Sequence, residues 1–263
     1  MWHLRIDDLD TPRNVKGAVE SILKTLETFG LEWDDKVFYQ SRHIDVYANF
    51  IDDLYRKKLI YPCTCSRKTL TTSDRSEAHH DIYPGICRLR TTFPDCPYAL
   101  RIKTDQRIIN FNDYLQGLIA HNMEKQDGDF IVKRKDSIIA YQFAVVIDDH
   151  LQQVNEVVRG FDLLDQTPKQ IYLQQLLGLE TPRYMHVPVI VDRQGYKLSK
   201  QTQASAVDLT KPHQVIFKLL GLLKQNPPTE LQSAPVKELI NWAILHWNPA
   251  SLKNIQRVLD DSI

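Results

Sequence analysis

The stretch AYQFAVVIDDHLQQVNEVVRGFDLL, residues 140–164, contains the two elements that decide the fold class. Residues 141–148 are apolar with helical spacing, which predicts a buried helix ending on charged residues. Residues 154–158 form a short β-branched run, which predicts a buried parallel strand closed by Arg159 and Gly160. A helix followed by such a strand is typical of α/β folds.

Arg159 stands at the C-terminal tip of this predicted strand. In open α/β sheets, ligands bind at the carboxyl ends of the strands. A guanidinium is planar, always charged and able to hold a carboxylate through two hydrogen bonds. Arg159 is therefore a candidate ligand for an anionic group, and the alternative is a surface arginine in a turn.

The composition excludes several classes of protein. The chain has 263 residues, enough for one enlarged domain or two smaller ones, with 33 basic and 33 acidic side chains. This balance gives no global basic field for nucleic acid, although a local basic patch remains compatible with it. No apolar run is long enough to span a bilayer, and the four cysteines do not form the pattern of a secreted disulfide framework. We expect a cytoplasmic protein.

The chain begins with a strand pattern at residues 3–7, followed by the acidic turn DLDTPR at residues 8–13. The acidic side chains there either bind an amine, a ribose or a metal, or cap the next helix. Helices are expected over residues 14–29 and 44–58, each with one apolar face. Residues 98–130 alternate like short antiparallel strands, and a helix and a further strand are expected over 168–177 and 184–191.

Three cysteines lie in a spacing that predicts a metal site. Cys63 and Cys65 form a C-x-C pair, and Cys87 follows in the sequence YPGIC. Three thiols indicate a tetrahedral structural zinc site that lacks one ligand. The candidates for the fourth ligand are Tyr83, His79 and His80. The alternative is three ordinary buried cysteines. Cys96 is spaced less suggestively and is interpreted as a plain thiol.

Two lysines flank a Leu-Ser pair after the last predicted strand, in the sequence KLSK. Lys197 and Lys200 are either a solvated pair or cations that stabilise the charge on a transferred phosphate. Taken alone, the motif favours the solvated pair. The remainder, residues 212–263, is expected to be a small helical appendage without chemistry of its own.

Together, and in this order, the motifs RIDDLDTPR, QSxR, YxCxC, YxxxC, AYxxAVVxDD, VxRGxDL, HxP and GYKLSKQ resemble those of the class I glutamyl-type aminoacyl-tRNA synthetases. Within that family the chain is most similar to the short glutamyl-Q tRNA(Asp) synthetases, over residues 2–206. One residue supports this placement: Val145 stands four positions after Tyr141, where discriminating glutamyl-tRNA synthetases typically have asparagine.

The resemblance implies a Rossmann-type α/β catalytic domain, incomplete at its N-terminus, with a zinc-bearing insertion and a small C-terminal helical region. The expected boundaries are 1–60 and 126–206 for the two parts of the catalytic domain, 61–125 for the insertion and 207–263 for the helices. It also implies a monomer that activates L-glutamate with ATP and Mg²⁺ without tRNA. The glutamyl group is then transferred to queuosine in the anticodon of tRNA(Asp).

Carried over residue by residue, the resemblance implies that Asp7, Tyr141 and Arg159 bind glutamate. Asp7 stands where the family usually has a glutamate that contacts the substrate amino group. Lys200, and beside it Lys197, match the ATP-binding lysine motif. For the metal, the resemblance implies one structural Zn²⁺ on these ligands: Cys63, Cys65, Tyr83 and Cys87.

One departure from the family pattern bears on activity. The family begins with a strand, an RFAPS segment and an HIGH-type motif that cradles ATP phosphates, and the sequence shows none of these. We therefore expect Met1 to be an internal or misassigned start of an active enzyme. The alternatives are a catalytically silent remnant that binds tRNA or a protein partner, and a fragment of a discriminating glutamyl-tRNA synthetase.

Overall fold

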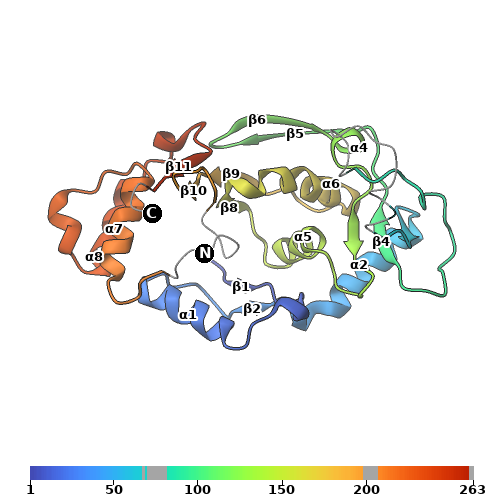
Figure 1. The fold of residues 1–263 in the computed structure, drawn as a ribbon, viewed down its shortest axis with the longest axis horizontal. Helices are drawn as coiled ribbons and strands as arrows, with labels where there is room; N and C mark the ends of the chain where they lie inside the picture. The colour runs from blue at the N-terminus through green and yellow to red at the C-terminus, as the bar shows by residue number, and fades with distance from the viewer. Residues whose placement is uncertain (67–68, 70–81, 198–206, 261–263) are drawn as a thin grey trace.

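The computed structural model describes residues 1–66, 69, 82–197 and 207–260, and its arrangement is shown in Figure 1. The molecule is elongated. Helices α7 (Pro212–Leu222) and α8 (Val236–His246) occupy one end, and helix α2 (Ile44–Arg56) with strand β4 (Ala99–Ile102) lies toward the other. Among the helices of the described residues, none has the length and apolar character needed to cross a bilayer.

Two separate pairs of parallel strands form the α/β part. β1 (Arg5–Ile6) pairs with β2 (Phe38–Tyr39), and β8 (Glu156–Gly160) pairs with β9 (Arg183–Val187). Helix α1 (Ala18–Thr28) connects the strands of the first pair. Helix α6 (Thr167–Leu177) connects those of the second and ends at Gly178, whose φ of 70° closes the helix. Within the described residues, each of these strands is hydrogen-bonded to one neighbouring strand, so β1 and β8 each keep one unpaired edge there.

Helix α5 (Tyr141–Leu151) is the centre of the main core, as its apolar sequence predicts. Its residues Phe143, Ala144 and Ile147 are fully buried. They belong to a cluster that also contains residues of α2, α6 and the antiparallel strands, with Tyr184 of β9 and Val157 of β8 packed into it, so α5 joins the second strand pair to the rest of the molecule. At about 25 cal/mol per Å² of buried apolar surface, such a helix contributes several kcal/mol to the stability of the fold.

The segment between the two strand pairs is antiparallel, as the alternation predicts. β3 (Ile60–Cys63), β4 and β7 (Ile131–Lys133) form a three-stranded sheet in the order β3-β4-β7. β5 (Ile108–Asp113) and β6 (Gly117–Asn122) form a hairpin that runs along the upper side of Figure 1 and leads into the short helix α4 (Met123–Gln126). Its closing residue, Gly117, has a φ of 78°, a conformation that glycine adopts without strain.

The C-terminal part contains a strand that the sequence did not reveal. β11 (Arg257–Leu259) pairs in parallel with β10 (Val189–Val191), so the expectation of a purely helical appendage needs this correction. Three residues are too short for a visible alternation, and a partner distant in sequence decides such a strand. Helices α7 and α8 form a second core with Phe29, which follows α1.

Two other expectations change in detail. The predicted strand at residues 184–191 is divided at Pro188 into β9 and β10, because proline has no N–H to donate to a ladder. The predicted strand at 154–158 is parallel but not buried, and the side chain of Val158 is 56% exposed. Its β-branched residues stand on a strand with one open edge, which lines a cavity.

Candidate active-site cleft

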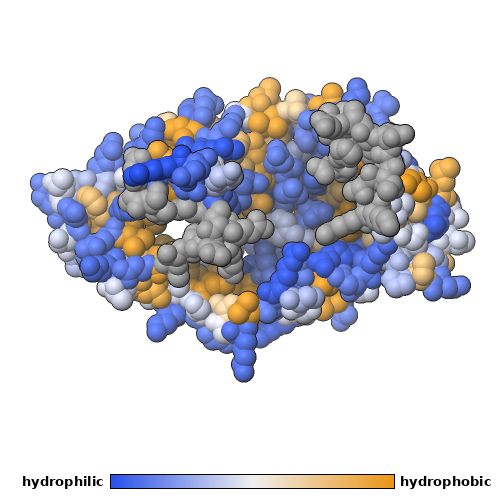
Figure 2. Space-filling model, viewed as in Figure 1, coloured by the Kyte–Doolittle hydropathy of each residue, from blue (hydrophilic) through white to orange (hydrophobic). Residues whose placement is uncertain are grey.

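A cavity of about 790 Å³ lies between β1 and β8, with one face of α5 on one side. The space-filling view in Figure 2 shows this face of the molecule hollowed at its centre. The cavity brings together Asp7, from the start of the chain, with Tyr141 and Arg159 of the stretch 140–164, as the sequence analysis selected them. Val145 and Asp149 line it as well.

The acidic side of the cavity is organised by one arginine. Arg5 Nε lies 2.8 Å from Asp7 Oδ1, and Arg5 Nη1 lies 2.7 Å from Asp149 Oδ1. Burial opposes the charge on Arg5, but Asp149 and Asp7 outweigh it and raise the pKa of its guanidinium. Burial raises the pKa of Asp149, and Arg5 opposes that shift. The result is two carboxylates around one cation, a side with net negative charge that suits an ammonium group.

The other aspartates of the acidic turn have structural partners. Asp8 accepts hydrogen bonds from the backbone N–H and the hydroxyl of Ser41, at 2.8 and 2.6 Å. Asp10 contacts Arg134 at 3.2 Å. Neither of them caps the next helix, because α1 begins after Gly17 without a side-chain cap, so the capping interpretation is wrong for these two residues. Of the three aspartates, only Asp7 faces the cavity.

Arg159 lies near the C-terminal end of β8 and is held from two sides. Its Nε donates to His186 Nε2 at 3.0 Å, and its Nη2 donates to Thr167 Oγ1 at 2.6 Å. Among the described residues, none is recorded as a hydrogen-bond partner of Nη1. Arg159 therefore presents a fixed guanidinium with unused donors to the cavity, which is the geometry a ligand carboxylate needs.

Tyr141 stands at the first residue of α5, with its side chain partly exposed in the cavity. Burial raises the pKa of its phenol, and the positive charge of Arg159 opposes the shift. The hydroxyl is therefore protonated at neutral pH and is available as a hydrogen-bond donor or acceptor.

Of the two lysines of KLSK, the structure describes Lys197. Lys197 forms an ion pair with Asp162 and is not among the residues that line the cavity. Asp162 belongs to the turn after β8, so this pair ties the KLSK segment to the strand that carries Arg159. Lys200 lies outside the described residues.

The cysteine segment forms a compact cluster at the far end of the molecule. The sulfur atoms of Cys63, Cys65 and Cys87 all lie within 4.8 Å of one another. Tyr83 Oη lies 3.3 Å from Cys63 Sγ and 3.5 Å from Cys65 Sγ. The structure thus brings the hydroxyl of Tyr83 to the three thiols, whereas the other candidate ligands, His79 and His80, lie outside the described residues.

Ionisation within this cluster is uneven. Burial opposes a thiolate at Cys87, but hydrogen bonds with the Thr64 backbone, Tyr83 and Cys65 outweigh it and lower the pKa of Cys87 to about 7. Burial raises the pKa of Tyr83, and its bonds to the cysteines add to that rise. The cluster therefore holds one readily formed thiolate and a phenol that keeps its proton.

Sequence reasoning did not select several polar residues of the cleft. Arg5 and Asp149 were visible only as charges beside an apolar strand and helix, and pairing between them depends on tertiary contact. His186 and Asp113 are fully buried and joined at 2.6 Å behind Arg159. The only signal for them was the HxP motif and a polar residue at the end of β5.

Comparison with known proteins supplies the family. The family model described as tRNA synthetases class I (E and Q), catalytic domain, matches residues 1–226. A protein from Ectopseudomonas mendocina named glutamyl-Q tRNA(Asp) synthetase is 44% identical over 247 residues, which cover 94% of this chain and 82% of that protein. A protein of the same name from Pseudomonas fluorescens is 41% identical over 249 residues, covering 95% and 81%.

Solved structures agree on the fold. A glutamate tRNA ligase from Elizabethkingia meningosepticum, in complex with its amino acid, superposes with a TM-score of 0.74 at 23% identity. A glutamate-tRNA synthetase from Elizabethkingia anophelis gives 0.77 at 22% identity. This chain spans 59% and 61% of the length of those two proteins. The chain therefore belongs to the class I glutamyl- and glutaminyl-type tRNA synthetases, and within them to the glutamyl-Q tRNA(Asp) synthetases.

Proposed function

We propose that this protein activates L-glutamate with ATP and Mg²⁺ and transfers the glutamyl group to queuosine in the anticodon of tRNA(Asp). The names of the relatives support the tRNA and the modified base. The observation that carries the proposal is the joint placement of Asp7, Tyr141 and Arg159 in one cavity, with Asp7 far from the other two in the sequence.

The charges of the cavity match a glutamate molecule. Arg159 offers two-point hydrogen bonding to a carboxylate. On the opposite side, Asp7 and Asp149 are available to the α-ammonium group, with Arg5 holding both carboxylates in place. Tyr141 adds a neutral hydroxyl between the two regions. A dipolar ligand with a carboxylate at one end and an ammonium at the other fits this distribution of charge.

The test of glutamate activation is ATP–pyrophosphate exchange that depends on glutamate. Arg159→Ala should abolish exchange, because a substrate carboxylate would lose its charged partner. Arg56→Ala is the control, since Arg56 is an exposed residue of α2 whose ion pair within the described part of the chain is with Asp53. Undiminished exchange in Arg159→Ala would refute the assigned role, and no exchange by the wild-type chain at saturating substrates would refute activation by this protein.

The acceptor is tested separately with radiolabelled glutamate. The product should carry glutamate on the anticodon base of queuosine-containing tRNA(Asp), and tRNA(Asp) without queuosine should remain unlabelled. Glutamate on the acceptor end of a tRNA(Glu) would instead identify a discriminating enzyme. For ATP, we propose contacts from Lys200 and Lys197, and Lys200→Ala should raise the KM for ATP.

We further propose one structural Zn²⁺ held by the cysteine cluster and Tyr83. A tetrahedral zinc with Zn–S bonds of about 2.3 Å has sulfur–sulfur edges of about 3.8 Å. The Cys65–Cys87 separation of 3.7 Å supports this geometry, and so do the distances of 3.3 and 3.5 Å from Tyr83 Oη to Cys63 and Cys65. Metal binding would displace the remaining thiol and phenol protons.

The segment at residues 61–125 would then be a zinc-bearing insertion between the two parts of a catalytic domain, residues 1–60 and 126–206, followed by a C-terminal region at 207–263. Metal analysis should find about one zinc per chain. Cys87→Ser should lose it, whereas Cys96→Ser, which changes an exposed cysteine outside the cluster, should retain it. A folded wild-type protein without metal would contradict the proposal.

A further inference from the structure

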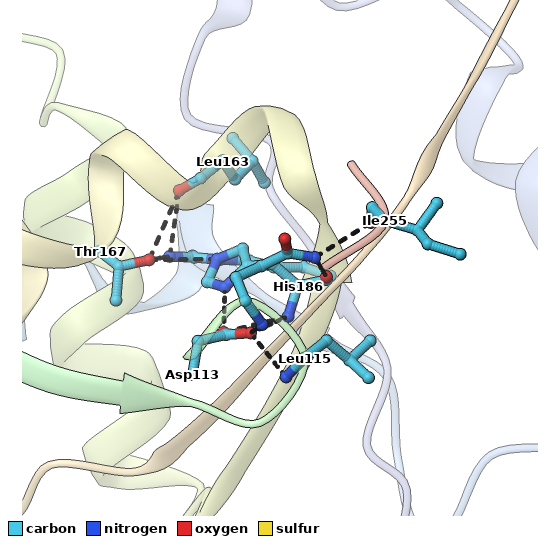
Figure 3. Close-up of polar contacts among 8 residues, drawn as sticks. Asp113, Leu115, Leu163, Thr167, His186 and Ile255 are labelled. Carbon is cyan, nitrogen blue, oxygen red and sulfur yellow. Dashed lines mark hydrogen bonds and ion pairs between the residues drawn. The ribbon is translucent and has the colours of Figure 1, made fainter. Parts of the chain in front are cut away.

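We propose that His186 and Asp113 are positioning residues that hold Arg159 in the orientation that binds the substrate carboxylate. The inference rests on the proposed function, in which Arg159 binds glutamate. Figure 3 shows the side chains of Asp113, at the end of β5, and His186, on β9, facing each other. Arg159, on β8, contacts the other ring nitrogen of His186.

The donors and acceptors assign the protonation of His186. A guanidinium can only donate, so Arg159 Nε–H at 3.0 Å requires that His186 Nε2 accepts. The imidazole therefore carries its proton on Nδ1. That nitrogen lies 2.6 Å from Asp113 Oδ2, where it donates to the carboxylate. Both side chains are fully buried, so water does not compete for these bonds.

Asp113 is held as an acceptor by the hairpin itself. The backbone N–H groups of Leu115 and Gln116 donate to its Oδ1 at 3.0 and 2.9 Å, and the N–H of His186 donates to its Oδ2 at 3.1 Å. Burial opposes the charge, but the bonds with His186 and these N–H groups lower the pKa of Asp113. An ionised Asp113 fixes the Nδ1–H tautomer, because a carboxylate has no proton to give.

Thr167 provides the second point of attachment. Its Oγ1 accepts from Arg159 Nη2 at 2.6 Å and lies 3.1 Å from His186 Nε2. Two bonds on different nitrogens fix both the position and the plane of the guanidinium, with Nη1 left for a ligand. If the proton moved to Nε2 of His186, two N–H donors would face each other at 3.0 Å, and Arg159 would have to turn away.

Two amide variants separate the roles of the ring nitrogens. In His186→Gln the amide reaches the position of Nε2, so its oxygen can still accept from Arg159. In His186→Asn the shorter amide reaches only the position of Nδ1 and keeps the bond to Asp113. We expect His186→Asn to raise the Kd for glutamate about tenfold or more, as loss of a bond to a charged group does, and His186→Gln to change it less.

The assay is calorimetric titration of the full chain with glutamate and, separately, with ATP. The Kd for ATP should stay unchanged in both variants, whereas a general loss of structure would weaken both ligands. Thermal unfolding checks that the variants are folded. Wild-type affinity for glutamate in His186→Asn, or equal losses in His186→Asn and His186→Gln, would overturn the inference.

A second readout does not depend on the ligand. In ¹⁵N-histidine-labelled protein, NMR should show His186 with a protonated Nδ1 and an unprotonated Nε2, and Asp113→Asn should shift the proton towards Nε2. The opposite tautomer in the wild type would overturn the inference on its own. If instead the tautomer is as expected but Arg159→Ala leaves glutamate binding intact, the proposed function has failed at Arg159, and with it the role of the pair in binding.

Discussion

Replacing Asp148 by alanine should be among the most damaging single changes to the stability of this protein. The carboxylate is fully buried at the polar end of α5. Its Oδ1 accepts from the hydroxyl of Tyr47 at 2.6 Å, its Oδ2 accepts from the amide of Gln40 at 2.7 Å, and Arg5 Nε lies 3.8 Å away. Burial raises the pKa of Asp148, and the bonds from Tyr47 and Gln40 oppose that shift.

The size of the effect follows from the groups left behind. Asp148→Ala leaves the hydroxyl of Tyr47, 0% exposed, and the amide of Gln40, 2% exposed, without a partner. A buried polar group without a partner costs about 1–3 kcal/mol, so the two together give roughly 2–6 kcal/mol of lost unfolding free energy. Asp148→Asn is the matched comparison, since its amide can still bond both groups once the Gln40 amide rotates.

Urea unfolding followed by far-UV circular dichroism measures both variants. We expect Asp148→Ala to lower the unfolding free energy by the amount estimated above. Asp148→Asn should lower it by less than half of that amount, because its amide still bonds Tyr47 and Gln40. Equal losses in the two variants, or an alanine variant within about 1 kcal/mol of wild type, would refute the argument from hydrogen-bond satisfaction.

Three other predictions concern single contacts. Gly178→Ala should lower the unfolding free energy by about 1 kcal/mol, because φ is 70° and only the backbone conformation resists the methyl group; a stability equal to wild type would contradict this. Gly160→Ala should lower the melting temperature, since its Cβ would lie 2.5 Å from Asp162 Oδ1; unchanged melting would show that Asp162 moves freely. Asp113→Asn should lower the unfolding free energy by its full amount at neutral pH, and this difference from wild type should shrink as the pH falls below 3.8. The reason is that the lowered pKa of Asp113 stabilises the fold only while the carboxylate is ionised; a difference in unfolding free energy that does not depend on pH would contradict it.

Much of the fold was predictable because its elements carry local signals. The apolar run of α5, the Thr-Pro start and glycine stop of α6, and the alternation in the β5–β6 region each predict an element that the structure contains. The strand pattern at residues 3–7 likewise contains β1, whereas the two-residue β2 and three-residue β11 carry too little local pattern for that. Their pairing with β1 and β10 depends on neighbours that only the folded chain supplies.

The same distinction between local signals and tertiary contacts applies to the candidate site. By itself, the sequence determined the residue types and the order of the motifs. Those indicated the family and selected Asp7, Tyr141, Arg159 and the cysteine cluster as candidate site residues. Only the tertiary structure decided that Arg5 joins Asp7 to Asp149, and that Asp113 and His186 stand behind Arg159. The physical reason is that charge pairing and hydrogen bonding act over about 3 Å, so they depend on distances in space that spacing along the chain does not encode.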